Sequence, residues 1–112
     1  MRRERPVRKL RAHAPVFAAL GDHTRLALLT KLSSGSQCSI AHLTEGSTLT
    51  RQAITKHLRV LEDAGLVRGV RRGREALFEL EPEPLDKARR ALDRISRQWN
   101  EALSRLKQLV EE

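Results

Sequence analysis

The chain has 112 residues, a length typical of one domain, and its 22 lysines and arginines outnumber its 14 aspartates and glutamates, for a net charge of +8. A single cysteine excludes an intramolecular disulfide, and no run of about 18 apolar residues is present that would span a membrane. Aromatic residues make up 3% of the chain, which argues against binding single-stranded nucleic acid by base stacking. The charge favours a polyanionic partner such as double-stranded DNA, and we expect a cytoplasmic protein with no membrane contact.

The first segment, residues 1–12, is predicted to be a flexible basic arm. It is rich in arginine but lacks the apolar region of a secretory signal peptide. Pro15 then opens a short helix that ends at Gly21. Asp22 is a good N-cap for a second helix, HTRLALLTKL. The leucines expected on the buried side of this second helix are Leu26, Leu29 and Leu32.

Two further helices are predicted after the break at SSGS. Ser39 is a candidate cap for a short helix, IAHLTE, with Ile40 and Leu43 facing inward. A longer helix begins after Thr50, also a good N-cap, and ends at Gly65. Its apolar stripe consists of Ile54, Leu58 and Leu61.

The helix from Thr50 carries its charges in an order that is unfavourable for an isolated helix. Arg51 and Lys56 lie toward its N-terminus, whereas Glu62 and Asp63 lie at its C-terminus. A helix dipole favours the opposite arrangement. Cations at this end are favourable when the helix N-terminus faces phosphates, so we predict that it enters the major groove of DNA. The alternative is the solvated face of an ordinary core helix.

A β-hairpin is predicted after Gly65, because LVRGV and ALFEL favour strands and VRRGRE joins them through Gly73. Three arginines at its tip would repel one another unless a counterion such as phosphate lies nearby. These arginines are Arg71, Arg72 and Arg74. The predicted fold is therefore mostly α with a small β-hairpin. It is a winged helix-turn-helix DNA-binding domain over residues 13–81.

Residues 82–112 are predicted to form a C-terminal dimerisation helix, which starts at Pro82 and Pro84. Its apolar residues alternate at spacings of 3 and 4, which is a heptad seam. The seam consists of Leu85, Ala88, Leu92, Ile95, Trp99, Ala102, Leu106 and Leu109. A second copy of the chain is the simplest partner for this seam. Packing against the first helix over part of its length is the alternative.

These segments together resemble the ArsR/SmtB family of winged helix-turn-helix bacterial repressors. ALGDHTRLALLTKL is similar to the family's ALADPTRRxIL, and LTRQAITKHLRVLEDAGLV is similar to its LSQSxVSxHLxVLxxAGLV recognition helix. LVRGVRRGREALFEL is similar to its wing, so the resemblance covers residues 14–81. It implies a homodimer that binds an inverted-repeat operator in double-stranded DNA and represses transcription.

The DNA contacts are expected from the 50–64 helix and the 67–80 wing. Gln52 and Thr55 are best placed to reach base edges, since glutamine pairs with adenine through two hydrogen bonds. His57 lies on the same helix, and we expect it to pack rather than to contact a base. The candidate DNA-binding residues are Thr50, Arg51, Gln52, Ala53, Thr55, Lys56, His57, Arg59, Arg71, Arg72 and Arg74. The resemblance implies a dimer interface of the first and last helices, formed by Val16, Phe17, Leu20, Leu92, Ile95, Trp99 and Leu106.

The metal sites of this family are not reproduced in the sequence. Aligning QCSIAHL with the thiolate motif ELCVCDL puts Ser39 and Ala41 at the thiolate positions and Cys38 one residue early. A lone thiol is a poor ligand set for Zn²⁺ or As(III), so we expect no metal cofactor and an inducer that is not a metal. Cys38 and His42 have i, i+4 spacing, which leaves a metal- or redox-responsive repressor as an alternative.

No spacing of Ser, His and Asp suggests a nucleophile with an oriented base, and no glycine-rich phosphate loop is present. We therefore expect a protein that is not an enzyme. A winged-helix protein–protein interaction module is the alternative from another class. Positive charge at the helix start, the wing tip and the arm together favours DNA over that module.

Overall fold

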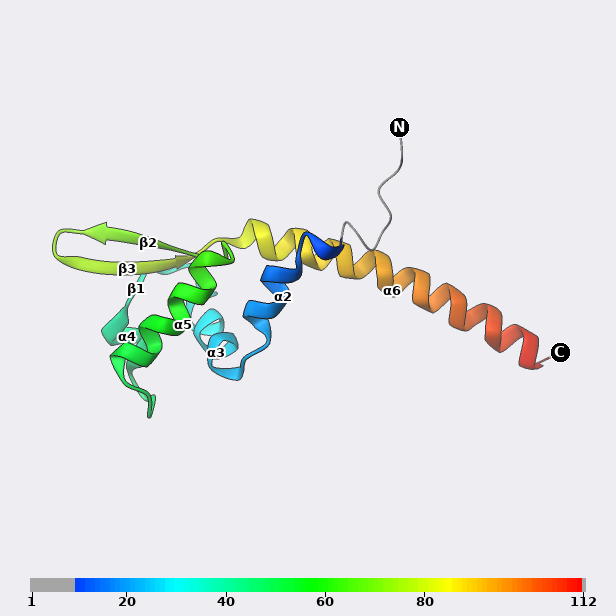
Figure 1. Cartoon of the computed structure of the whole chain (residues 1–112), viewed down its shortest axis with the longest axis horizontal. Coiled ribbons are helices and arrows are strands. Elements are labelled where there is room, and N and C mark those ends of the chain that lie inside the picture. Colours follow the sequence, from blue (N-terminus) through cyan, green and yellow to red (C-terminus); the bar gives the residue numbers. More distant parts are fainter. Residues whose placement is uncertain (1–9, 112) are drawn as a thin grey trace, which may run out of the picture.

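The computed structural model describes residues 10–111, so residues 1–9 of the predicted arm lie outside it. Residues 10–12 belong to a helical turn rather than to a flexible arm, since the backbone N–H of His13 donates to Leu10 O at 3.0 Å. The elements that follow are α2 (Ala14–Leu20), α3 (His23–Leu32), β1 (Cys38–Ser39), α4 (Ile40–Thr44), α5 (Arg51–Asp63), β2 (Val67–Arg72), β3 (Glu75–Leu80) and α6 (Pro82–Glu111) (Figure 1).

The predicted caps of the helices are confirmed. The side chains of Asp22, Ser39 and Thr50 each accept a hydrogen bond from the backbone N–H three residues later, at 3.0 or 3.1 Å. Gly65, at a φ of +78°, ends α5 and donates its N–H to Glu62 O. This left-handed residue closes the helix as in a Schellman motif, and it turns the chain toward the sheet.

The predicted hairpin is confirmed, with Arg72 paired to Glu75 across a loop of Gly73 and Arg74. Gly73 has a φ of +59° at the first loop position, which matches a type II′ turn. A third strand, β1, pairs with β3 on its other edge and was not predicted. A two-residue strand is too short for alternating hydrophobicity to reveal it, so only the tertiary pairing defines it.

The core lies between α2, α3, α4, α5 and the sheet. Its largest fully buried side chains are Leu32, Leu43, Ile54, Leu58, Leu61 and Leu66. The predicted stripe of α5 is therefore confirmed, whereas the predicted inward face of α3 is partly wrong. Leu26 is 47% exposed and Leu28 is buried in its place, because α3 buries Leu28, Leu29 and Leu32. Ile40 is only half-buried, at the edge of this core.

The last helix, α6, is 30 residues long and extends well beyond the rest of the domain (Figure 1). Its first part lies against α2 and buries Ala88 and Ala91. Its second part projects away, with Trp99 at 66% and Leu106 at 58% exposed. The intramolecular alternative therefore holds for the first part only. None of the helices within residues 10–111 combines the length and the apolar character that a membrane crossing needs.

Candidate DNA-binding surface

The outer face of α5 forms one side of a shallow groove. Within it, the hydroxyl of Thr55 donates to Arg51 O at 2.7 Å, which fixes the Thr55 rotamer along the helix. The residues that line the groove are Ile40, Arg51, Gln52, Thr55, Lys56 and Arg59. The structure therefore brings together five of the predicted contact residues from α5, with three cations and one amide among them.

Three other predicted residues of this segment lie outside the groove. The hydroxyl of Thr50 accepts from Ala53 N as the helix cap, and Ala53 itself is half-buried. His57 is turned toward the first turn of α3, with its Nδ1 3.4 Å from the guanidinium of Arg25 and 3.7 Å from the carboxylate of Asp22. The expected packing role of His57 agrees with this position, and its inclusion among the DNA contacts stays a prediction.

The wing carries paired charge at its base and unpaired charge at its tip. At the base, Arg68 forms an ion pair with Glu79 and lies 3.2 Å from Glu81. The hydrogen bond from Arg68, joined by one from Gln37, lowers the pKa of Glu79 below its ordinary value. At the tip, Arg71, Arg72 and Arg74 are exposed, and none has a carboxylate within 4 Å among residues 10–111. Within the hairpin, positive charge is therefore paired at the base and left unpaired at the tip.

The acids at the end of α5 have a role that sequence reasoning missed. The Glu62 carboxylate accepts a hydrogen bond from Gly69 N in β2 at 3.2 Å. This contact ties the recognition helix to the base of the wing. Glu62 and Gly69 lie on different elements, so no periodicity within α5 could have indicated this contact.

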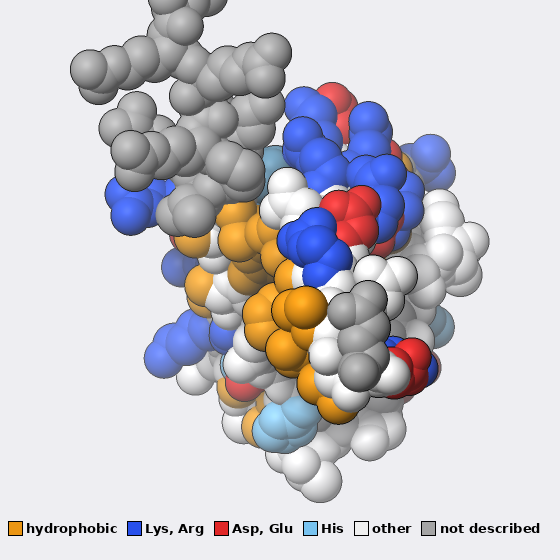
Figure 2. All heavy atoms as spheres, turned by 90° about the vertical axis from the view of Figure 1, so that its right-hand side faces the viewer, with side chains coloured by type: hydrophobic (Ala, Val, Ile, Leu, Met, Phe, Trp, Pro, Cys, Tyr) orange, Lys and Arg blue, Asp and Glu red, His pale blue; other side chains and the backbone are white. Residues whose placement is uncertain are grey.

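The apolar residues proposed for a dimer interface divide into three groups by exposure. Val16 is 6% exposed and belongs to the core, so it has little surface left for a partner. Phe17, Leu20 and Ile95 are half-buried in the single chain. Leu92, Trp99 and Leu106 are exposed. The view along α6 from its free end shows hydrophobic side chains gathered beside a cluster of lysines and arginines (Figure 2).

Cys38 and His42 do not form part of a larger donor cluster. Cys38 is 5% exposed, and its Sγ lies 3.8 Å from Ser36 O. His42 instead lies 3.6 Å from Glu45. Within residues 10–111 no group of three or more His, Cys, Asp or Glu side chains is placed to hold a metal ion.

Fold and surface together define a winged helix-turn-helix protein, and comparison with known proteins agrees. A helix-turn-helix domain family matches residues 20–70. The chain is 33% identical to the HTH-type transcriptional regulator Rv2034 of Mycobacterium tuberculosis, over 85% of each chain. It is 29% identical to the HTH-type transcriptional repressor SmtB of the same species, over 84% of this chain and 67% of that one. An ArsR-like transcriptional regulator from Rhodococcus sp. RHA1 superimposes with a TM-score of 0.75 at 40% identity, over 87% of this chain and 91% of that one.

The chain belongs to the ArsR/SmtB family of transcriptional regulators. Its winged helix-turn-helix is a DNA-binding domain, built from α4, α5 and the β2–β3 hairpin. The relatives named here are transcriptional regulators.

Proposed function

We propose that this chain is a homodimeric repressor that binds an inverted-repeat operator in double-stranded DNA. The observation that carries the proposal is the distribution of unpaired cations. Arg51, Lys56 and Arg59 in the groove have no carboxylate within 4 Å among residues 10–111, and the same is true of the wing tip. The arginines at the base of the wing and at the start of α6 are paired instead. Farther along α6, Arg94, Arg97, Arg105 and Lys107 are also unpaired within the described part of the chain, and they belong to neither the groove nor the wing.

In this proposal α5 enters the major groove, and its exposed side chains divide the work of recognition. Gln52 pairs with a base edge. The Thr55 hydroxyl already donates to Arg51 O, so Thr55 presents its oxygen lone pairs and its methyl group to another base. Arg51, Lys56 and Arg59 contact phosphates, which sets register rather than sequence preference. The three wing-tip arginines extend the phosphate contacts along the duplex.

The dimer follows from the exposed apolar face of α6. Leu92, Trp99 and Leu106 are 46%, 66% and 58% exposed in the single chain, more than a soluble helix normally leaves uncovered along one face. A second copy related by a two-fold axis covers this face with the same residues from both chains. Two recognition helices then reach successive major grooves about 34 Å apart, which requires an inverted repeat.

Repression is proposed to be steric, since a bound dimer covers DNA that polymerase needs at the promoter. The relative named as a repressor supports this direction of regulation. The inducer is proposed not to be a metal, because the thiolate positions of the family hold Ser39 and Ala41 and the remaining thiol, Cys38, is buried.

Fluorescence anisotropy with the DNA upstream of the chain's own gene tests the proposal. The protein should bind this DNA at least about a thousandfold more tightly than a random duplex, with affinity that falls steeply with salt. Gln52→Ala combined with Lys56→Ala should abolish the preference while leaving the dimer intact. Lys87→Ala is the matched control. This lysine lies on α6, pairs with Glu83, and is close to Asp63 at the C-terminal end of α5.

Equal affinity for both duplexes would contradict the proposal. Binding that survives the Gln52 and Lys56 changes would favour the protein–protein interaction module. Zn²⁺, Cd²⁺ or As(III) added to the same complex should leave its affinity unchanged, and stoichiometric release of DNA would contradict the assignment of a non-metal inducer.

A further inference from the structure

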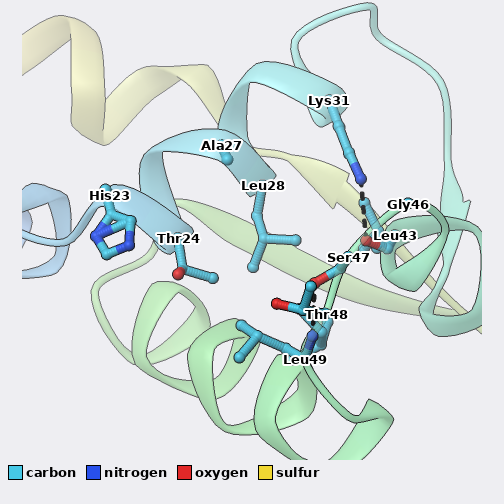
Figure 3. Close-up of a pocket in the computed structure, with 11 residues that line it drawn as sticks. His23, Thr24, Ala27, Leu28, Lys31, Leu43, Gly46, Ser47, Thr48 and Leu49 are labelled. Atoms are coloured by element: carbon cyan, nitrogen blue, oxygen red, sulfur yellow. Dashed lines mark hydrogen bonds between the residues drawn. The ribbon is translucent and has the colours of Figure 1, made fainter.

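A pocket of about 410 Å³ lies between α3 and the turn that leads into α5 (Figure 3). This volume is within the range of sites for small molecules. One wall is α3, with Thr24, Leu28 and Lys31, and the other is the turn, with Ser47 and Thr48. The pocket is separate from the groove on the outer face of α5, because the two share no lining residue.

The floor of the pocket is apolar and fixed by the core. Leu28, Leu43 and Ile54 reach it, and each is at most 2% exposed. Ala27 and Leu49 add further apolar surface at its sides. A ligand that enters therefore needs an apolar body, which these side chains hold without rearranging the fold.

The rim of the pocket is polar and has one sign of charge. Thr24 lies on α3 and Thr48 on the facing turn (Figure 3), and neither hydroxyl has a hydrogen-bond partner among residues 10–111. The Lys31 ammonium donates to Leu43 O at 3.2 Å and to Glu45 O at 3.1 Å, which leaves its third N–H free to donate. His23 also lines the pocket, and no aspartate or glutamate does. This arrangement suits an anionic head group.

We propose that this pocket binds a small carboxylic acid with an apolar body, and that the bound acid weakens DNA binding. The second part rests on the repressor function proposed above. The turn that forms one wall ends at Thr50, whose hydroxyl caps α5. A carboxylate held beside this helix start repels the phosphates that α5 must approach, and the two anions compete for the same positive field.

Binding is tested without DNA, on the ¹⁵N-labelled full chain, with phenylacetate as the probe. Saturable shifts should be confined to backbone amides in residues 23–31 and 43–50. Phenylacetamide, which has the same body without the charge, should bind at least about tenfold more weakly, since charge-assisted hydrogen bonds are about twice as strong as neutral ones. Shifts elsewhere, equal affinity of acid and amide, or no saturation at millimolar concentration would overturn the site.

Matched variants locate the contacts. Thr24→Val with Thr48→Val removes both hydroxyls at nearly constant volume and should weaken phenylacetate binding at least about tenfold. Thr30→Val is the control, because its hydroxyl bonds to Leu26 O on the same helix outside the pocket. Unchanged binding in the double variant would overturn the assignment of the polar rim.

The link to DNA is measured separately by anisotropy. Phenylacetate should lower operator affinity in the wild type and have a smaller effect in the Thr24 and Thr48 double variant. Binding of phenylacetate without loss of operator affinity would overturn the regulatory part. Failure of the chain to bind operator in the absence of any acid would contradict the proposed repressor instead, so the two failures are distinguishable.

Discussion

The side chain of Arg25 on α3 contacts both α2 and α5. From the first turn of α3 its Nε donates to Ala19 O at 2.7 Å, at the end of α2. The same guanidinium lies 3.4 Å from Ala18 O and 3.4 Å from Nδ1 of His57 on α5. Ala18 O also accepts from Gly21 N at 3.2 Å, so the carbonyl that depends on Arg25 is that of Ala19, and the contact with His57 joins α3 to α5.

Arg25→Ala is expected to lower the free energy of unfolding by about 1–3 kcal/mol, because it removes the hydrogen bond to the part-buried Ala19 carbonyl together with the contacts to Ala18 O and His57. Arg25→Lys should recover part of the loss, since one ammonium reaches fewer of the three acceptors. Urea denaturation measures the effect. Arg97→Ala on the exposed part of α6 serves as the control and should stay within about 0.5 kcal/mol of wild type. A loss of the same size in both variants would contradict the bridging role.

Asp22 makes stability depend on pH at the same junction. The hydrogen bond from Arg25 N lowers its pKa below the ordinary value, and the charges of Arg25, His57 and His23 add to this effect. A carboxyl whose pKa is lower in the folded chain contributes stability above its unfolded pKa of about 3.9, and the contribution is lost as pH falls through the folded value. The stability advantage of wild type over Asp22→Asn, which keeps the cap, should therefore shrink between pH 5 and pH 2. Urea unfolding across this range measures it, and a constant difference would contradict the assignment.

At the scale of the element, the stability of α5 depends on the glycine that ends it. Gly65 at a φ of +78° lets the chain turn so that its own N–H and that of Leu66 bond back to the helix. A Cβ there would meet only Pro84 Cγ at 3.5 Å, an ordinary contact, so the strain of Gly65→Ala is in the backbone. We expect a loss of about 1–2 kcal/mol in unfolding free energy by urea denaturation, and a smaller loss for Gly65→Asn. Equal losses of unfolding free energy for Gly65→Ala and Gly65→Asn would contradict the assignment of the strain to the positive φ.

The elements that the sequence predicted well are those whose signals are local. The caps Asp22 and Thr50 and the glycine at 65 act within a few residues, and α5 keeps a regular apolar spacing. The features that sequence reasoning missed depend on contacts between distant segments. The strand β1 exists only through its pairing with Phe78 and Leu77. His57 turns inward toward Arg25, which is 32 residues away in sequence.

The same distinction applies to the candidate site. The charge order of α5 and the arginines of the wing indicated which side of the domain carries exposed cations, because those charges conflict with local preference. That this side faces DNA stays a proposal. The pocket beside α3 was not predicted, since its walls come from α3, the turn before α5 and Ile54 on α5 itself. A periodic pattern reports which face of one helix is apolar, and it carries no information on the space that two such faces leave between them.

At the scale of the whole molecule, the exposed part of α6 predicts what loosens the dimer. Trp99→Ala should weaken self-association by about 3 kcal/mol, more than a hundredfold in Kd, as expected for a large aromatic side chain removed from an interface. Sedimentation equilibrium measures it. The fold of each chain should be unchanged, because Trp99 is 66% exposed there. Gln108→Ala on the opposite face of α6 is the control, and a Trp99 variant that remains a dimer would contradict this interface.

The exposed second part of α6, as the proposed dimer interface, also affects how such a regulator responds to its own concentration. In the proposed homodimer, two chains must associate before both halves of the operator can be bound. When the chain is scarce, the concentration of dimer is therefore proportional to the square of the chain concentration. Occupancy of the control region then rises more abruptly than the supply of protein does. Modest changes in synthesis or turnover are thereby converted into a sharper on–off response, with no effector required.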